Sequence, residues 1–356
     1  MNRRDAMKAM GVGAVAAMLP EAAAQTAFPK GAIIRTILRD YAPEDLAGGA
    51  TLFHEHLQLA RDFNQKFFAA TAATREANGL PPAPARGGGA GRGNATPPPD
   101  IMHDVDLMTA EVLKAKQEGN IACIVEAGHP EMGRDINFIR QVAMKSGVPI
   151  VIGGGFYSQP WYPKEISTMS EDQVLKALLK QVDDDVVGAF GEIGSWDEIS
   201  KDERKVFRAV GRAHVETNIP IFTHTGIPGK SAIEQLDIFE DQGVKPEHVC
   251  IGHLGNLVDP NVAVQKTICR RGAFIGFDRQ GNNDTPQVPM VMALIEAGFA
   301  DHLLFSADAS SGYAKTITVF LPKLKAAGAT DEVLHKIMYD NPRRFLAFIP
   351  KRSRKH

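Results

Sequence analysis

Two histidines separated by a single residue, His54 and His56, are the first side chains along the chain that could bind a metal ion. They follow a short apolar run at residues 51–54, which is typical of a β-strand. Because side chains two apart on a strand face the same side, both imidazoles can reach one ion. A His-x-His pair also arises often by chance, so this pair alone is weak evidence for a metal site.

Four more potential ligands stand where other apolar runs end. Glu192 and His224 end the fourth and fifth of the runs that we expect to be strands, His253 ends the sixth, and Asp308 follows the eighth. In a closed βα barrel the carboxyl ends of all strands meet at one face, so these side chains would converge there with the histidine pair. Imidazole nitrogens and carboxylate oxygens are ligands of zinc and similar ions. The sequence therefore predicts a metal centre at that face.

Each of these residues also has a purely structural interpretation. His224 or His253 could be a hydrogen-bonded core histidine. Glu192 could belong to an ion pair, and Asp308 could cap the following turn. Polar side chains are costly to bury unpaired, so their joint placement at strand ends favours the metal site. The other histidines are interpreted as surface residues or caps, although one of them, His129, lies just past the second strand on the expected active face: His103, His129, His214, His248, His302, His335 and His356.

The elements that would position these ligands alternate between short apolar runs and segments of helical period, a pattern typical of βα units with a parallel sheet. Strands are expected at residues 51–54, 121–126, 149–153, 187–192, 220–224, 249–253, 273–277 and 302–306. Helices are expected at residues 104–117, 135–146, 171–182, 202–217, 232–242 and 290–297. Eight such units close into a barrel more readily than they form an open sheet, so the predicted fold is an α/β (β/α)8 TIM barrel.

The composition limits the domain count and the kind of partner. The chain has 356 residues, and residues 26–350 suit one barrel domain. Its 40 basic and 42 acidic residues nearly cancel, so no bulk field favours nucleic acid, and a small-molecule substrate is expected. The three cysteines are widely spaced in apolar runs and are expected to pack in the core rather than form disulfides: Cys123, Cys250 and Cys269.

The first 25 residues are typical of an export signal. Arg3 and Arg4 precede an apolar stretch at residues 9–19 and a small-residue segment at residues 22–24. The paired arginines resemble a twin-arginine leader, although Ala6 stands where that pattern usually has phenylalanine. The apolar stretch is shorter than the about 20 residues that span a bilayer. We expect a periplasmic protein without stable membrane insertion, and a disordered basic tail is the alternative.

One segment interrupts the alternation of strands and helices. Residues 80–99 read LPPAPARGGGAGRGNATPPP, which is too rich in proline and glycine for either periodic structure. This flexible insert follows the first strand, so on a barrel it would lie on the active face. It is either a lid over the substrate or a solvated insert without a role. Residues 351–356 form a basic tail.

Several motifs resemble the phosphotriesterase family of the amidohydrolase superfamily, close to its lactonase-like and phosphotriesterase-homology-protein branches. The matching segments run in order at residues 51–57, 133–135, 222–225, 250–255, 276–279 and 341–346. The resemblance implies a (β/α)8 barrel with two divalent metal ions, usually zinc, with cobalt, manganese or iron as alternatives. It also implies that the protein can form a homodimer, because family members often pair.

The resemblance implies a role for each ligand. His54, His56 and Asp308 would hold a buried ion, and His224 and His253 a more exposed one. The bridging ligand in the family is usually a carboxylated lysine, and here Glu192 stands in its place, as in the homology-protein branch. A carboxylate carries the same single charge but is shorter, so the backbone must approach or the ions must shift.

The implied reaction is a hydrolysis. Two ions would lower the pKa of a shared water, the bridging hydroxide would attack the substrate, and Asp308 would accept the proton. The resemblance to lactonases places Tyr157 and Arg279 beside the substrate, whereas wall packing and a surface ion pair are the structural alternatives. The segment at residues 309–313 is shorter than in lactonases that take long acyl chains. A carboxylic ester or lactone is therefore the expected substrate, with an organophosphate triester or a non-catalytic metal-binding barrel as alternatives.

Overall fold

The computed structural model describes residues 27–82, 100–257, 259, 261–280 and 286–352. The leader at residues 1–25, most of the insert at residues 80–99 and the last four residues of the basic tail lie outside these ranges. The predictions for those segments therefore stay predictions. None of the helices in the described part of the chain combines the length and the apolar character that crossing a bilayer requires.

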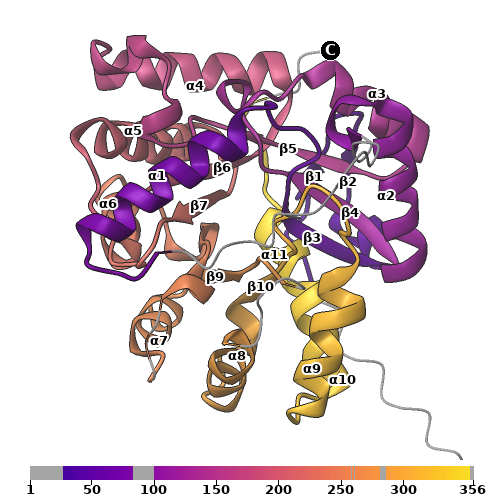
Figure 1. The fold of residues 1–356 in the computed structure, drawn as a ribbon. Coiled ribbons are helices and arrows are strands. Elements are labelled where there is room, and N and C mark those ends of the chain that lie inside the picture. Colours follow the sequence, from indigo (N-terminus) through magenta and orange to yellow (C-terminus); the bar gives the residue numbers. More distant parts are fainter. Residues whose placement is uncertain (1–26, 83–99, 258, 260, 281–285, 353–356) are drawn as a thin grey trace, which may run out of the picture.

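Eight parallel strands form the centre of the molecule, and each pairs with the next one along the chain (Figure 1). This arrangement confirms the predicted (β/α)8 barrel, and the expected strands match the observed ones to within a few residues. The strands are β3 (Ala50–Glu55), β4 (Ile121–Glu126), β5 (Ile150–Gly154), β6 (Val187–Ser195), β7 (Ile221–Thr225), β8 (Val249–Ile251), β9 (Phe274–Phe277) and β10 (Leu303–Phe305). A two-stranded hairpin of β1 (Ile34–Arg35) and β2 (Asp40–Tyr41) precedes them.

Helices surround the strands, and each of the six predicted helices is present. Two of them begin with capping boxes, in which Ser170 and Ser200 bond the amides of Gln173 and Glu203. The helices after β3 are α1 (Phe63–Ala77), α2 (Val105–Gly119), α3 (Ile136–Ser146), α4 (Glu171–Asp185), α5 (Lys201–Thr217), α6 (Ala232–Asp241), α7 (Ala263–Arg270), α8 (Gln287–Glu296), α9 (Leu321–Ala326), α10 (Asp331–His335) and α11 (Asn341–Leu346). Sequence analysis did not single out α1, which stands between β3 and α2.

The barrel closes between its first and last strands through bonds at their carboxyl ends. The amide of His54 donates to Ser306 Oγ at 3.1 Å, and the amide of Asp308 donates to the carbonyl of His54 at 3.3 Å. Two candidate metal ligands are thereby joined through their own backbones, although they stand more than two hundred residues apart in the sequence. The contacts that close the barrel therefore also bring these two candidate ligands together.

The core fills the space inside the barrel and between the strands and helices. The three cysteines are buried and form no disulfide, as predicted. Behind β10, the side chain of Asn341 donates to the carbonyls of Ala300 and Leu303 at 2.8 and 2.9 Å. Asn341 is fully buried and begins α11, so it ties this last helix to the start of β10. The family-like segment at residues 341–346 therefore stabilises the barrel from outside the candidate site.

Replacing Asn341 by alanine is expected to lower the free energy of unfolding by about 1–3 kcal/mol, because the buried carbonyl of Leu303 and that of the half-buried Ala300 lose their donor. Urea denaturation followed by circular dichroism measures the change. Asn137→Ala, at an exposed position of α3, is the matched control and should change stability by less than about 0.5 kcal/mol. Equal stabilities of the two variants would contradict this role of Asn341.

Candidate metal centre

The structure brings all six predicted ligands together at the carboxyl ends of the strands. His54 belongs to β3, Glu192 to β6 and His224 to β7. His56, His253 and Asp308 follow β3, β8 and β10. Five of the six are nearly fully buried, and Asp308 alone keeps 11% of its side chain exposed. The cluster is therefore enclosed, and Asp308 marks its side toward solvent.

The six side chains form two groups of possible metal ligands. In the first group, Asp308 Oδ1 lies 3.6 Å from His54 Nε2 and 3.2 Å from His56 Nε2. The second group comprises Glu192, His224 and His253. There, Glu192 Oε2 lies 2.7 Å from His224 Nδ1 and 3.2 Å from His253 Nε2. Each group offers three ligand atoms that a single ion could contact.

Glu192 connects the two groups. Its Oε1 atom lies 3.4 Å from His56 Nε2, and its Oε2 atom lies 3.3 Å from His54 Nε2. Oε2 is also the atom that faces His224 and His253. The glutamate is thus long enough to reach both groups, although it is shorter than the carboxylated lysine for which it stands.

The spacing around His54 and His56 fits a bound cation better than direct hydrogen bonding, whereas Glu192 Oε2, His224 and His253 lie at hydrogen-bonding distances of 2.7–3.2 Å from one another. Nitrogen or oxygen ligands about 2.1 Å from a tetrahedral ion lie about 3.4 Å from each other. The distances from Nε2 of His54 and His56 to the two carboxylates, 3.2–3.6 Å, are of this size. Both ring nitrogens of His54 are buried without a hydrogen-bond partner among the described residues. These histidines therefore face a common point rather than one another.

The buried carboxylates of the cluster are kept ionised by their neighbours. Burial alone would raise the pKa of Glu192 and Asp308, but the surrounding histidines, with Arg279 beside Asp308, hold both well below their usual values. Burial, with His253 as the next cause, lowers the pKa of His224 to about 4, so this imidazole is neutral. Burial disfavours a positive charge on His253 and His56 as well, but Asp278 raises the pKa of His253 to about 9, and Asp308 and Glu192 raise that of His56. Imidazole nitrogens and carboxylate oxygens are the ligand types that zinc and similar ions bind.

The backbone of β6 brings Glu192 close to the histidines. Gly191 adopts φ +153°, and a Cβ atom there would lie 2.3 Å from Phe222 Cδ1, so only glycine fits. The pairing of β6 with β7 shifts register between Phe190 and Ile193, on either side of the glutamate. His129 Nε2 donates to the carbonyl of Glu192 at 2.9 Å and fixes the position of this segment.

The interpretation of the remaining histidines as surface residues or caps was wrong for two of them. His129 is fully buried against Glu192, and burial lowers its pKa to about 3. His214 is 5% exposed, and its Nδ1 atom donates to the carbonyl of Ile219 at 2.7 Å. Both lie next to strands that bury them, which polarity alone does not reveal. His335 is exposed, as expected, and His356 lies outside the described residues.

Acidic residues that were not proposed as ligands hold the ligands in place. Asp278 Oδ1 accepts a hydrogen bond from His253 Nδ1 at 2.6 Å, which leaves Nε2 directed toward Glu192. Glu55 is fully buried and accepts from Ser306 Oγ and from the amides of Ala307 and Ala309, on both sides of Asp308. Both acids could have been noticed in the sequence, because each stands next to a residue that was predicted to belong to the site.

Tyr157 and Arg279, the two predicted substrate residues, both contact the cluster. The Tyr157 hydroxyl lies 3.2 Å from His224 Nδ1, and the side chain is 1% exposed. Arg279 Nε donates to Asp308 Oδ2 at 2.9 Å, and 29% of its side chain is exposed. Arg279 NH1 lies 3.4 Å from Asn256 Oδ1. Arg279 is therefore an ion-pair partner of a candidate ligand at the mouth of the site, and Tyr157 forms part of its wall.

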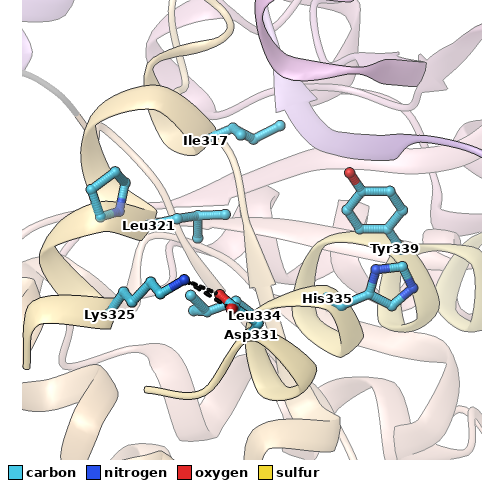
Figure 2. Close-up of a pocket in the computed structure, with 8 residues that line it drawn as sticks. Ile317, Leu321, Lys325, Asp331, Leu334, His335 and Tyr339 are labelled. Carbon is cyan, nitrogen blue, oxygen red and sulfur yellow. Dashed lines mark hydrogen bonds and ion pairs between the residues drawn. The ribbon is translucent and has the colours of Figure 1, made fainter. Parts of the chain in front are cut away.

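A pocket lies away from the six candidate ligands. Figure 2 shows a pocket of about 340 Å³ between α9 and α10, in which Lys325 and Asp331 form an ion pair at 2.7 Å. The ring of His335 stacks on Tyr339 at 4.2 Å along one side of this pocket. The described residues that line it include none of the six ligands, and it offers no comparable gathering of metal ligands.

A (β/α)8 barrel with histidines and carboxylates gathered at its carboxyl face defines a class of metal-dependent hydrolases. Within that class, residues 36–346 match the model of the phosphotriesterase family, and the chain belongs to this family. An aryldialkylphosphatase of Saccharolobus solfataricus is 31% identical over 271 residues, 67% of this chain and 84% of that protein. An N-acetyltaurine hydrolase of Rattus norvegicus is 24% identical over 351 residues, 88% of this chain and 98% of that protein.

A solved structure of a lactonase from Listeria monocytogenes matches with a TM-score of 0.71 at 22% identity, over 88% of this chain and 98% of that chain. A likeness at this identity shows the fold alone. The relatives found by sequence are named as hydrolases, and they support a hydrolase here as well. They act on different bonds, so the substrate has to be argued from the site.

Replacing Asp278 by asparagine is expected to weaken zinc binding by about 10–100-fold, because His253 loses the carboxylate that orients its ring. Competition with a chromogenic chelator measures the apparent affinity. Asp241→Asn, at the exposed end of α6, makes the same chemical change away from the cluster and should leave the affinity as it is. Wild-type affinity in the Asp278 variant would contradict the positioning role.

Proposed function

We propose that this chain is a hydrolase that uses two divalent metal ions to cleave a carboxylic ester or a lactone. The observation that supports the proposal best is the arrangement of six ligands in two groups of three that share the carboxylate of Glu192. A barrel that kept these residues only for stability would not need two buried carboxylates among four imidazoles, because burying a charge costs free energy unless it is neutralised.

The ligands would be divided between the ions according to the two groups. His54, His56 and Asp308 would hold one ion, His224 and His253 the other, and Glu192 would contribute one oxygen to each. Nitrogen and oxygen ligands suit zinc, and also cobalt, manganese or iron. When bound, such ions lower the pKa of a water and polarise the oxygen of a substrate.

Asp308 is the best placed proton acceptor. Its Oδ1 atom faces His54 and His56, whereas Oδ2 accepts a hydrogen bond from Arg279, whose side chain is 29% exposed. A carboxylate with one oxygen free of the ion can take a proton as a general base and pass it outward. The Arg279 guanidinium keeps the carboxylate ionised until the proton arrives, because its positive charge favours the anion.

A lactone or ester suits the enclosed site better than a phosphotriester. The reacting carbonyl is planar, whereas a phosphotriester carries four oxygen substituents in a tetrahedron around phosphorus. Tyr157 and His224 are at most 2% exposed beside the cluster, so the reacting group would contact a wall that is already packed. Arg279 at the mouth would stabilise the negative charge that develops on an oxygen during attack. Because one relative is named an aryldialkylphosphatase, phosphotriester cleavage is the second candidate reaction.

Export to the periplasm is part of the same proposal. The basic and apolar segments of residues 1–25 support it, since their order is typical of a twin-arginine leader. A chain exported after folding could take up its metal in the cytoplasm.

The two-ion arrangement predicts a change in metal content on replacing Glu192. The wild-type chain should keep about two zinc ions after dialysis against metal-free buffer, and Glu192→Gln should keep one or fewer, because the amide cannot bridge two cations as an anion. Glu198→Gln, which is exposed in the loop after β6, should behave like wild type. Elemental analysis by mass spectrometry gives the counts, and two retained ions in the Glu192 variant would rule out the bridge.

The substrate preference is tested with zinc-loaded protein. The value of kcat/KM for γ-butyrolactone is expected to exceed that for the phosphotriester paraoxon, because the lactone presents a planar carbonyl to the enclosed site. Acetylated amines should be assayed alongside, since one relative hydrolyses an amide by its name. Faster cleavage of paraoxon would reject the ester and lactone preference in favour of the phosphotriesterase alternative.

A further inference from the structure

Helix α1 places an aromatic face over the metal cluster. Phe63 and Phe67 stand four residues apart, so they share one side of the helix. Phe63 is 7% exposed and Phe67 is partly buried, whereas the neighbouring Phe68 is 44% exposed. The buried face of α1 is therefore the one that carries Phe63 and Phe67.

The ring of Phe67 contacts both a candidate ligand and Arg279. Its ring centroid lies 6.2 Å from that of His224 in an edge-to-face arrangement. On its other side, the Arg279 guanidinium lies over the Phe67 ring at 5.8 Å from the centroid. Phe67 thus contacts a candidate ligand and also the arginine that pairs with Asp308.

Three more rings complete an aromatic wall, which we define as Phe63, Phe67, Tyr157, Trp161 and Trp196. Trp161 lies 5.4 Å from Phe63 and 4.9 Å from Tyr157, measured between ring centroids. Trp196 lies 5.9 Å from Phe67 and 6.0 Å from His224. The wall therefore extends from the metal cluster to the inner face of α1.

The two tryptophans carry hydrogen-bond donors that lack an acceptor. Nε1 of Trp161 and Nε1 of Trp196 are buried, and none of the described residues accepts from them. A buried donor left without a partner costs free energy, so a ligand that offers an acceptor here gains affinity. The face of an aromatic ring can accept an N–H group, whereas a saturated ring or chain cannot.

Contacts at both ends hold α1 in this place. Before its first turn, Arg61 forms an ion pair with Asp100. After its last turn, Asn78 accepts a hydrogen bond from Lys230 Nζ at 2.5 Å, and Lys230 lies in the loop after β7. In the view of Figure 1, α1 runs across the barrel. The helix is thereby fixed across the side of the barrel that carries His224.

We propose that α1 is a substrate-binding element and that Phe67 determines specificity for substrates with an aryl group near the reacting carbonyl. The inference rests on the proposed hydrolysis of an ester or lactone and names the kind of substrate. The wall offers ring faces and edges at several angles, and aromatic pairs are stabilised beyond their buried area. It also offers two unpaired indole donors, which an aryl ring can satisfy and an alkyl group cannot.

Binding can be measured without catalysis, because the chain contains two tryptophans and both belong to the aromatic wall. Tryptophan fluorescence of the zinc-loaded full chain, excited at a wavelength that tyrosine does not absorb, therefore reports on the wall. Phenylacetate and cyclohexylacetate are the probes, since they share charge and ring size but differ in aromaticity. Phenylacetate should change the fluorescence and bind about two- to tenfold more tightly than cyclohexylacetate.

Two variants of Phe67 test whether α1 causes this preference for the aromatic probe. Phe67→Ala and Phe67→Leu should both bring the ratio of the two affinities close to one. Phe67→Leu keeps an apolar side chain at this position, so it serves as the test if the alanine variant folds poorly. Phe68→Ala removes the exposed neighbour on the same helix and should keep the wild-type ratio. The ratio of kcat/KM for γ-phenyl-γ-butyrolactone to that for γ-cyclohexyl-γ-butyrolactone should follow the same order.

The outcomes separate this inference from the proposed function. Equal binding of the two probes by the wild-type chain, or an unchanged ratio in both Phe67 variants, would overturn the role of Phe67 even if lactones are hydrolysed. An aryl preference that depends on Phe67, in a protein that hydrolyses no ester or lactone, would support the aromatic wall and reject the proposed reaction.

Discussion

Two buried carboxylates among four imidazoles are the constraint on which the rest of the structure depends. Moving an ionised carboxylate out of water costs several kcal/mol even after the protein relaxes. Arg279 offsets part of the charge of Asp308, but Glu192 is surrounded by histidines alone within hydrogen-bonding distance. Bound cations would neutralise both carboxylates without requiring a proton on the neighbouring histidines.

The barrel holds its ligands with a strained backbone. His253, Arg279 and Asp308 all adopt left-handed conformations, with φ of 58°, 62° and 47°. Such conformations cost about 1–3 kcal/mol each and persist where the surroundings impose them. Glu55 imposes the one at Asp308, since it binds the amides on both sides of that residue. Asp278 acts in the same way on His253, because it accepts hydrogen bonds from the amide and from a ring nitrogen of that residue.

The fold and the ligands could be read from the sequence because both follow from regular patterns. Strands alternate with helices, and the carboxyl ends of parallel strands meet at one face, so Glu192 and His224 could be placed together without coordinates. The positioning residues follow no such pattern. Glu55 accepts hydrogen bonds across the junction of β3 and β10 from residues some 250 positions away in the sequence. No local sequence pattern predicts those partners. The aromatic face of α1 was missed because its two phenylalanines stand among small and polar residues.

The central claim is that the six ligands bind two ions, and diffraction from crystals of the zinc-loaded protein at the zinc absorption edge tests it most directly. The account predicts two anomalous peaks with Glu192 between them, one beside His54, His56 and Asp308 and the other beside His224 and His253. A single peak, or a Glu192 side chain turned away from both ions, would contradict the account.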